Sequence, residues 1–167
     1  MSECEIELIK QAEEKAACLI EKFRKFSKTL VLAESCTAGL VSSLLAGVPG
    51  ASGVLWGSFV CYTKEAKVSM LDLNENELDT YGLVSKETAC SMAAGVLAKS
   101  TADFAAAVTG LAGPDGDNSP VPVGTIWAAC AARNGETEVQ KFCFSGSRNE
   151  VRTKAAIAVL DIFLKKH

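Results

Sequence analysis

Residues 29–39 read TLVLAESCTAG, and this stretch decides the fold. Its first part, Thr29 to Ala33, is a short apolar run of β-prone residues that predicts a buried strand. Its second part opens a run from Cys36 to Ala46 that predicts a helix, stopped by Gly47. A buried strand that passes directly into a helix is typical of layered domains that mix both kinds of element.

Outside this stretch the chain continues to mix strands and helices. Ser2 and Glu5 form a capping box, which predicts a helix over about residues 3–26. Apolar and capped segments predict strands over 53–62, 102–108, 124–132 and 136–144, and helices over 64–71, 74–82, 85–99 and from 147 onward. Asn134-Gly135 joins the last two strands and predicts a type I′ hairpin turn. We therefore expect the α/β class, with one layered domain over residues 1–167 and a mixed β-sheet flanked by helices.

Length and composition exclude several classes of protein. A chain of 167 residues that is 49% hydrophobic and 22% charged fits one globular domain. The formal charge of −3 disfavours broad binding to nucleic acid, which needs a basic surface. The longest apolar run, residues 126–132, is too short to cross a membrane, and residues 1–14 lack the basic start of a signal peptide.

The numbers of cysteines and histidines disfavour several kinds of catalytic and metal site. The seven cysteines are odd in number and no pair has CxxC spacing, so we expect reduced thiols in the cytoplasm. His167, the last residue, is the one histidine, which disfavours a Ser-His-Asp or Cys-His centre and a histidine metal site. If the protein is a hydrolase, its base is Lys, Tyr, Asp or Glu.

The junction between the first strand and the following helix is one candidate site. Side chains there lie beside free backbone N–H groups and the positive end of a helix, a place that favours an oxyanion or a phosphate. Ser35 is a candidate nucleophile, and Cys36 is a rival because a helix N-terminus lowers the pKa of a thiol. Spacing alone favours a simpler interpretation, in which Ser35, Cys36 and Thr37 only cap the helix.

A lysine is the natural base for a serine nucleophile when histidine is missing. Lys64 and Lys67 lie at the end of the second predicted strand, where burial in a cleft would lower the pKa of an amine. The pattern does not distinguish the two lysines, and most lysines in such places are solvated.

Two further segments could hold an anion. Residues 109–116 read TGLAGPDG, and such glycines allow backbone N–H groups to converge on a phosphate, although a purely structural loop is also common. The segment matches neither the Walker A nor the dinucleotide-binding pattern. Arg148 in the first turn of the last helix opposes the helix dipole, a conflict that an anionic ligand would remove, although an exposed arginine would be tolerated.

Taken in order, these motifs resemble one known family. They are Glu34 to Gly39, Tyr62 with Lys67, Thr109 to Pro114, Pro122 to Thr125, and Gly146 with Arg148, Val151 and Arg152. Together they resemble the CinA carboxy-terminal domain family over residues 6–163. Characterised enzymes of this family are nicotinamide-nucleotide amidohydrolases, and many members have glycine where Ala38 stands.

The resemblance implies hydrolysis of the carboxamide of nicotinamide mononucleotide to nicotinate mononucleotide and ammonia, without a metal or a redox cofactor. It implies Ser35 as the nucleophile, Lys67 as the base and Tyr62 as a member of the proton network. It further implies substrate-binding roles for the following residues: Thr109, Gly110 and Gly113 at the ribose phosphate or amide, Arg148 at the 5′-phosphate, and the N–H groups of Cys36 and Thr37 at the oxyanion.

The resemblance leaves alternatives open. A module that binds nucleotides without turnover, linked to competence or the response to DNA damage, would share the fold, and a thiol enzyme would use Cys36 instead of Ser35. Many members carry a larger N-terminal domain, whereas Met1 here opens directly onto the first helix, so we expect a stand-alone form. We also expect a homo-oligomer, from the resemblance and from the apolar terminal helices, and no nucleic-acid or membrane partner.

Overall fold

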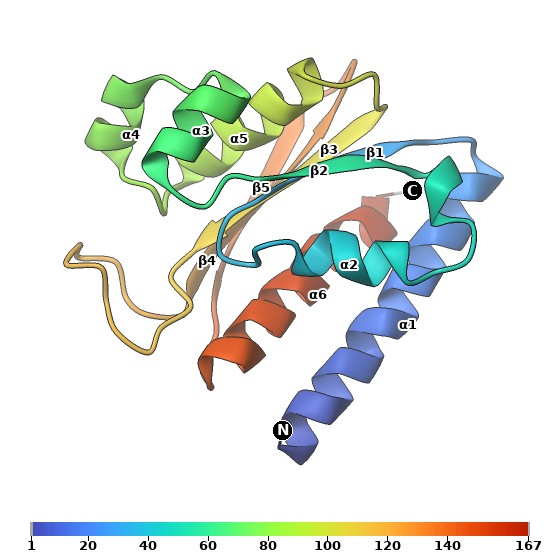
Figure 1. The fold of residues 1–167 in the computed structure, drawn as a ribbon, viewed down its shortest axis with the longest axis horizontal. Coiled ribbons are helices and arrows are strands. Elements are labelled where there is room, and N and C mark those ends of the chain that lie inside the picture. Colours follow the sequence, from blue (N-terminus) through green and yellow to red (C-terminus); the bar gives the residue numbers. More distant parts are fainter. Residues whose placement is uncertain (1, 167) are drawn as a thin grey trace.

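The computed structural model describes residues 2–166 as a mixed sheet between two layers of helices (Figure 1). The sheet has the order β2-β1-β3-β4-β5. Strand β1 is parallel to both of its neighbours, whereas β4 is antiparallel to both β3 and β5. The strand bounds are Leu30–Glu34 for β1, Leu55–Val60 for β2, Phe104–Gly110 for β3, Thr125–Ala132 for β4 and Thr137–Cys143 for β5. The predicted α/β class with a mixed sheet is therefore confirmed.

Helices cover both faces of the sheet. One face carries α1 (Glu3–Lys25), α2 (Leu40–Ala46) and α6 (Arg148–Lys166), and the other carries α3 (Lys64–Leu71), α4 (Glu75–Tyr81) and α5 (Lys86–Ala98), as Figure 1 shows. Side chains of a strand alternate between the two faces. In β1, Leu32 therefore packs towards α1 and α6, while Val31 packs towards α5.

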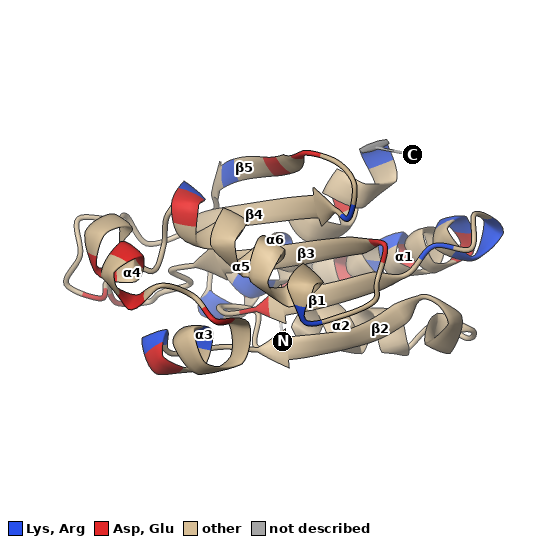
Figure 2. Ribbon diagram, turned by 90° about the horizontal axis from the view of Figure 1, so that it is seen from above, with Lys and Arg blue, Asp and Glu red and all other residues tan. Residues whose placement is uncertain are grey.

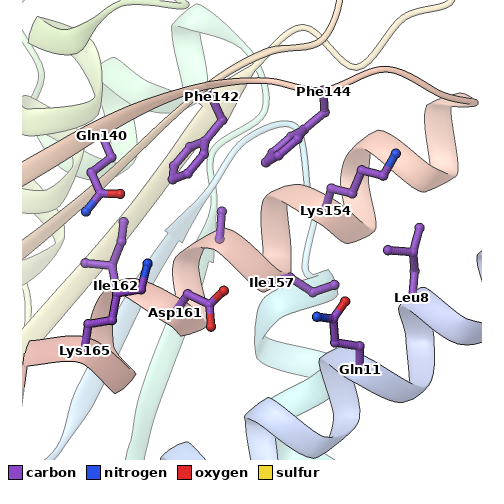
Figure 3. A pocket seen from close by; sticks show the side chains of 11 residues that line it. Leu8, Gln11, Gln140, Phe142, Phe144, Lys154, Ile157, Asp161, Ile162 and Lys165 are labelled. Carbon is purple, nitrogen blue, oxygen red and sulfur yellow. The ribbon is translucent and has the colours of Figure 1, made fainter.

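The apolar faces of the terminal helices, α1 and α6, pack against each other and against the sheet. Phe23 of α1 and Phe163 of α6 pack edge to face, with ring centroids 5.7 Å apart, and both contact Phe104 of β3 in the same way. A groove of about 180 Å³ remains between α1, α6 and β5, and Figure 3 shows Phe142 of β5 and Phe144, just after this strand, facing it. The two rings stack on each other, with centroids 5.4 Å apart.

Few charged residues enter the sheet. Figure 2 shows Lys, Arg, Asp and Glu mainly on the helices and connections. Among strands β1 to β4 the one charged residue is Glu34, at the carboxyl end of β1, and its side chain is 1% exposed. A buried carboxylate costs free energy unless it is hydrogen-bonded, so Glu34 marks a special place in the fold.

Several predicted boundaries need correction. The helix predicted from Cys36 begins at Leu40, because Ala38 and Gly39 have φ angles of 50° and 91°, which a right-handed helix does not contain. Strand β3 lies two residues later than the predicted 102–108, and β2 is shorter than the predicted 53–62 because a 3₁₀ turn occupies Ala51–Gly53.

The hairpin between β4 and β5 is present, but the type I′ turn prediction is wrong. Neither Asn134 nor Gly135 has a positive φ, and the Gly135 N–H donates to the Ala132 carbonyl at 3.2 Å. Arg133 is therefore a central turn residue, and its guanidinium donates to the carbonyl of Leu97 in the last turn of α5 and to those of Ser100 and Ala102 in the α5–β3 connection. These contacts outside the hairpin explain why the local dipeptide rule does not apply.

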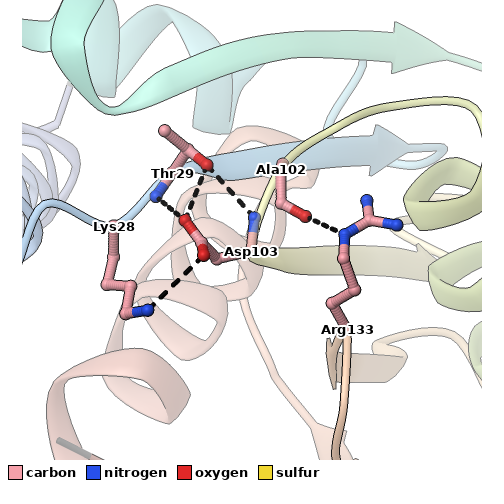
Figure 4. A network of polar contacts seen from close by, with 5 residues as sticks. All are labelled: Lys28, Thr29, Ala102, Asp103 and Arg133. Atoms are coloured by element: carbon pink, nitrogen blue, oxygen red, sulfur yellow. Dashed lines mark hydrogen bonds and ion pairs between the residues drawn. The ribbon is translucent and has the colours of Figure 1, made fainter.

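The starts of β1 and β3 are joined by Asp103, as Figure 4 shows. Its carboxylate accepts from both the N–H and the hydroxyl of Thr29 at 2.9 Å and forms an ion pair with Lys28 at 3.4 Å. Burial opposes ionisation, but the Thr29 hydrogen bonds and Lys28 outweigh it and hold the pKa of Asp103 below its usual value. The neighbouring Ala102 carbonyl accepts from Arg133 at 2.8 Å, so the same corner also holds the hairpin.

No described helix combines the length and the apolar character that a membrane span requires. All seven cysteines are free thiols. The expected capping box of Ser2 and Glu5 is confirmed at the start of α1, and Ser147 pairs with Glu150 in the same way at the start of α6.

Candidate active site

A cavity of about 220 Å³ opens at the carboxyl ends of the parallel strands. In open α/β sheets this edge is where ligands usually bind. Larger hollows exist, such as one of about 420 Å³ beside α2, but a serine and a lysine meet in this one. The lining residues are Ser35, Cys36, Tyr62, Lys67, Leu83, Val84, Thr109, Gly110, Leu111, Ala112, Asp117 and Arg148.

Ser35 and Lys67 lie in direct contact. Ser35 follows β1, and its N–H donates to the Val108 carbonyl of β3 at 3.0 Å, which fixes the residue at the sheet edge. Lys67 lies on α3, and its Nζ is 2.9 Å from Ser35 Oγ. Nζ also donates to the carbonyls of Cys61 at 2.9 Å and Tyr62 at 3.3 Å.

Lys67 is fully buried, and burial lowers the pKa of its amine. No carboxylate within residues 2–166 forms an ion pair with it, so no neighbouring negative charge holds the proton on Nζ. The structure also separates the two candidate lysines. Lys64 forms ion pairs with Asp79 at 2.6 Å and Glu75 at 3.0 Å, and the hydrogen bond to Asp79 raises the pKa of Lys64. Lys67 is thus the lysine at the serine.

The turn that carries Ser35, residues 35–39, is anchored by Glu34. One carboxylate oxygen accepts from the Thr37 hydroxyl at 2.8 Å and from the N–H groups of Gly39 and Val41 at 3.0 Å. The other accepts from the N–H of Ser42 at 2.9 Å. The carboxylate of Glu34 therefore occupies the N-terminus of α2 itself, and the predicted oxyanion donors, the N–H groups of Cys36 and Thr37, lie before this helix and are not bound by Glu34.

The rival nucleophile is poorly placed for reaction. Cys36 is 5% exposed, and burial raises the pKa of its thiol to about 12. A thiol is a nucleophile as its thiolate, which is scarce far below the pKa. The predicted lowering of this pKa by a helix N-terminus is absent because the helix begins at Leu40.

Tyr62 and Arg148 form a second contact at the cavity. Arg148 donates to the Tyr62 hydroxyl at 2.7 Å and to the Gly113 carbonyl at 2.5 Å. Tyr62 meets Lys67 through its backbone carbonyl, while its hydroxyl lies with Arg148, and its side chain is 49% exposed. Gly113 contributes a carbonyl to this contact and is not among the residues that line the cavity.

The chain is similar to known proteins in sequence and in fold. The model of the CinA C-terminal domain matches residues 12–167. The chain belongs to this family. The chain is 40% identical over 132 residues to the nicotinamide-nucleotide amidohydrolase PncC of Escherichia coli K12, and the match covers 79% of this chain and 80% of that protein.

Other relatives of this CinA domain carry more general names. It is 41% identical to a CinA-like protein of Geotalea uraniireducens, over 86% of this chain but only 34% of that protein, so it spans about a third of such relatives. A solved structure of the competence/damage inducible protein CihA from Agrobacterium tumefaciens superposes with a TM-score of 0.90 at 38% identity. That match covers 93% of this chain and 94% of the other.

The end of β3 also borders the cavity, through Thr109 and Gly110. The Thr109 hydroxyl donates to the Leu83 carbonyl at 2.7 Å, which ties the end of β3 to the connection before α5. A Cβ at Gly110 would lie 2.7 Å from the Thr125 carbonyl, so the close approach of β4 explains this glycine. Thr37 is fully buried and lies outside the cavity lining, so its side chain is not placed to touch a ligand.

The sequence interpretation assigned no role to three polar residues in or near the CinA site. Glu34 was visible as a charged residue at the end of an apolar strand. Arg152 stands in the last motif of the resemblance, and it donates to carbonyls of the Ser35 turn. Asp117 is the one acidic residue among the described residues that line the cavity, and nothing in its loop sequence distinguishes it from Asp115.

Proposed function

We propose that this CinA domain hydrolyses the carboxamide of nicotinamide mononucleotide, with Ser35 as the nucleophile and Lys67 as the general base. The observation that carries the proposal is the 2.9 Å contact between Ser35 Oγ and the buried Nζ of Lys67. The relative named nicotinamide-nucleotide amidohydrolase supports the substrate class. The products would be nicotinate mononucleotide and ammonia.

The contacts of Lys67 suit a neutral amine. A neutral amine has two N–H bonds and one lone pair. The carbonyls of Cys61 and Tyr62 can only accept, so they take the two N–H bonds. Nζ donates to Ser35 Oγ when it is an ammonium, whereas in the neutral amine its lone pair is left for the hydroxyl of Ser35, which then donates its proton towards Nζ. A base in this state is ready to receive the proton of the attacking serine.

The reaction proceeds in two halves. Ser35 Oγ bonds to the amide carbon while its proton passes to Lys67 Nζ, and the carbonyl oxygen becomes an oxyanion. The carbon–nitrogen bond then breaks, and Lys67 returns the proton to the departing amine, which leaves as ammonia. Water attacks the resulting ester, gives a proton to Lys67 and releases the carboxylic acid, while Ser35 recovers its proton.

The charges of the cavity match the two charges of this substrate. Nicotinamide mononucleotide carries a cationic pyridinium ring and an anionic phosphate. Arg148 supplies a guanidinium, which can bind a phosphate through forked hydrogen bonds. Asp117 supplies a carboxylate at the same cavity, and its hydrogen bonds from Ser119 lower its pKa, which keeps it ionised. Thr109 and Gly110 line the same cavity.

Ammonia release from nicotinamide mononucleotide tests the proposal. Wild-type protein should release ammonia, and Ser35→Ala should reduce kcat at least about 1,000-fold because the nucleophile is missing. Ser43→Ala, an exposed serine on α2, is the matched control and should keep the wild-type rate. Equal release by wild type and Ser35→Ala would move the nucleophile elsewhere. No release by folded wild-type protein would favour the alternative of a nucleotide-binding regulatory module.

We also propose that the domain works in the cytoplasm as a homo-oligomer. Free cysteines suit a reducing compartment. The reaction needs no metal or redox cofactor, since Ser35 and Lys67 supply the nucleophile and the base.

A further inference from the structure

Arg152 holds the backbone of the Ser35 turn from the side of α6. Its Nη2 donates to the Thr37 carbonyl at 2.8 Å, and its Nε donates to the Cys36 carbonyl at 3.2 Å. No carboxylate within residues 2–166 forms an ion pair with Arg152, and its remaining contact is the side-chain amide of Asn149 at 3.4 Å. The positive charge of the guanidinium therefore acts on two backbone carbonyls.

Because a peptide unit is planar, a hydrogen bond that fixes its carbonyl also fixes the direction of its N–H. The peptide bonds of the turn are trans, so each carbonyl points away from the N–H of the following residue. The carbonyl of Cys36 shares its plane with the N–H of Thr37. The carbonyl of Ser35 shares its plane with the N–H of Cys36, and it accepts from Ala38 at 3.0 Å. Both planes are thus fixed at their oxygen ends.

The remaining N–H groups around the turn are already used. Ser35 donates to Val108, and Ala38 donates to Ser35. The carboxylate of Glu34 takes those at the start of α2. The Cys36 N–H lies against its own sulfur, at the residue that lines the cavity beside Ser35. Within the described residues, the Thr37 N–H donates to no acceptor, so this group is left for a ligand.

We propose that Arg152 is a positioning residue that orients and polarises the Thr37 N–H for the oxyanion of the reaction. A hydrogen bond to the oxygen end of a peptide strengthens its N–H as a donor. Donors held in place before charge develops are usually the largest contribution to catalysis of this kind. The proposal rests on the proposed function, because the oxyanion forms when a serine attacks a carbonyl.

Arg148 provides a contrast on the same helix. It lies four residues before Arg152, one helical turn away, and it lines the cavity, whereas Arg152 does not. Arg148 is therefore placed to bind the substrate in its ground state, and Arg152 is placed to act only through the backbone. The two arginines should affect different kinetic constants.

Steady-state kinetics of two glutamine variants separate these roles. Arg152→Gln should lower kcat about 10- to 100-fold and leave KM within about twofold, since it misaligns a donor without deleting it. Arg148→Gln should mainly raise KM. Lys154→Gln is the matched control, because Lys154 is a cation on α6 that donates to the Ser145 carbonyl, away from the Ser35 turn, and its kinetics should match wild type. A wild-type kcat in folded Arg152→Gln, or a rise in KM alone, would overturn the proposal.

A second pair of measurements guards against misfolding and against the wrong substrate. Arg152→Lys keeps the charge but can reach the two carbonyls less well, so its kcat should lie between those of wild type and Arg152→Gln. The rate at which a fluorophosphonate modifies Ser35, followed by mass spectrometry, should fall in the same order. This probe needs the oxyanion donors but not the nucleotide, so a normal order of labelling with no turnover of nicotinamide mononucleotide would fault the substrate and support Arg152. Equal labelling of all three folded proteins would reject the role of Arg152, whereas no labelling of the wild-type protein would reject Ser35 as the nucleophile.

Discussion

At the scale of the residue, the decisive property is the protonation state of Lys67. Its Nζ is surrounded by two carbonyls and a hydroxyl, with no carboxylate to stabilise a positive charge. Burial lowers its pKa, so the neutral base is populated at a pH below that of an ordinary lysine. In the proposed mechanism, Lys67 thereby performs the role that histidine performs in Ser-His-Asp hydrolases.

The pH profile of kcat/KM reports this property. The active base is neutral, so activity should rise with pH through the lowered pKa of Lys67 and then reach a plateau. The acid limb should have a midpoint below the value of about 10.4 for a free lysine. Lys67→Arg should reduce activity about 100- to 10,000-fold at every pH, because a guanidinium does not lose its proton.

Two outcomes of the pH experiment would contradict this account. A midpoint at the value of a free lysine would mean that burial does not control the base. A Lys67→Arg variant with near wild-type turnover would mean that another group takes the proton. Lys64→Arg serves as the control, because Lys64 is paired with Glu75 and Asp79 away from the cavity.

At the scale of the element, the short turn before α2 decides where the helix begins. Ala38 adopts φ 50° and Gly39 adopts φ 91°, and the helix starts only after both. The left-handed conformation disfavours an alanine by about 1–2 kcal/mol. The family resemblance, in which glycine is common at this position, has a physical basis in this angle.

Ala38→Gly should stabilise the protein. Relief of the left-handed strain exceeds the entropy that glycine loses on folding, so we expect a gain of about 0.5–1 kcal/mol and a rise in Tm of about 2 °C. Thermal unfolding by calorimetry measures this change. Ala46→Gly, at the right-handed end of α2, is the control and should lower Tm. An unchanged or lower Tm in Ala38→Gly would show that the turn carries no strain.

At the scale of the whole molecule, the sequence predicts the layers better than the site. Apolar periodicity reveals the strands and most helices, because burial on one or two faces determines it. Local rules fail where distant residues intervene, as at Arg133, which binds the α5–β3 connection and changes the hairpin turn. Ser35 and Lys67 are 32 residues apart in sequence, so their contact comes from the pairing of β1 and β2 and not from any local pattern. Glu34 and Arg152 stand in the motifs of the resemblance, but no role could be assigned to them, because most of their partners are backbone groups that the sequence does not identify.

The assembly state also belongs to this scale. The apolar faces of α1 and α6 pack on each other, so they no longer argue for a partner, and the family resemblance is the remaining reason to expect a homo-oligomer. Sedimentation velocity should therefore show a species larger than one chain of 17.6 kDa. A single species at the mass of one chain, across a range of concentrations, would reject the prediction.

The hydrogen bonds from Arg152 to the Ser35 turn have a consequence for synthesis on the ribosome. The proposed nucleophile, Ser35, is translated long before Arg152, whose guanidinium holds the backbone of its turn. A chain that is cut before α6 contains all five strands, but its Ser35 turn lacks this support. Activity should therefore appear only after α6 has been made, and messages cut short before α6 should yield products that do not turn over substrate.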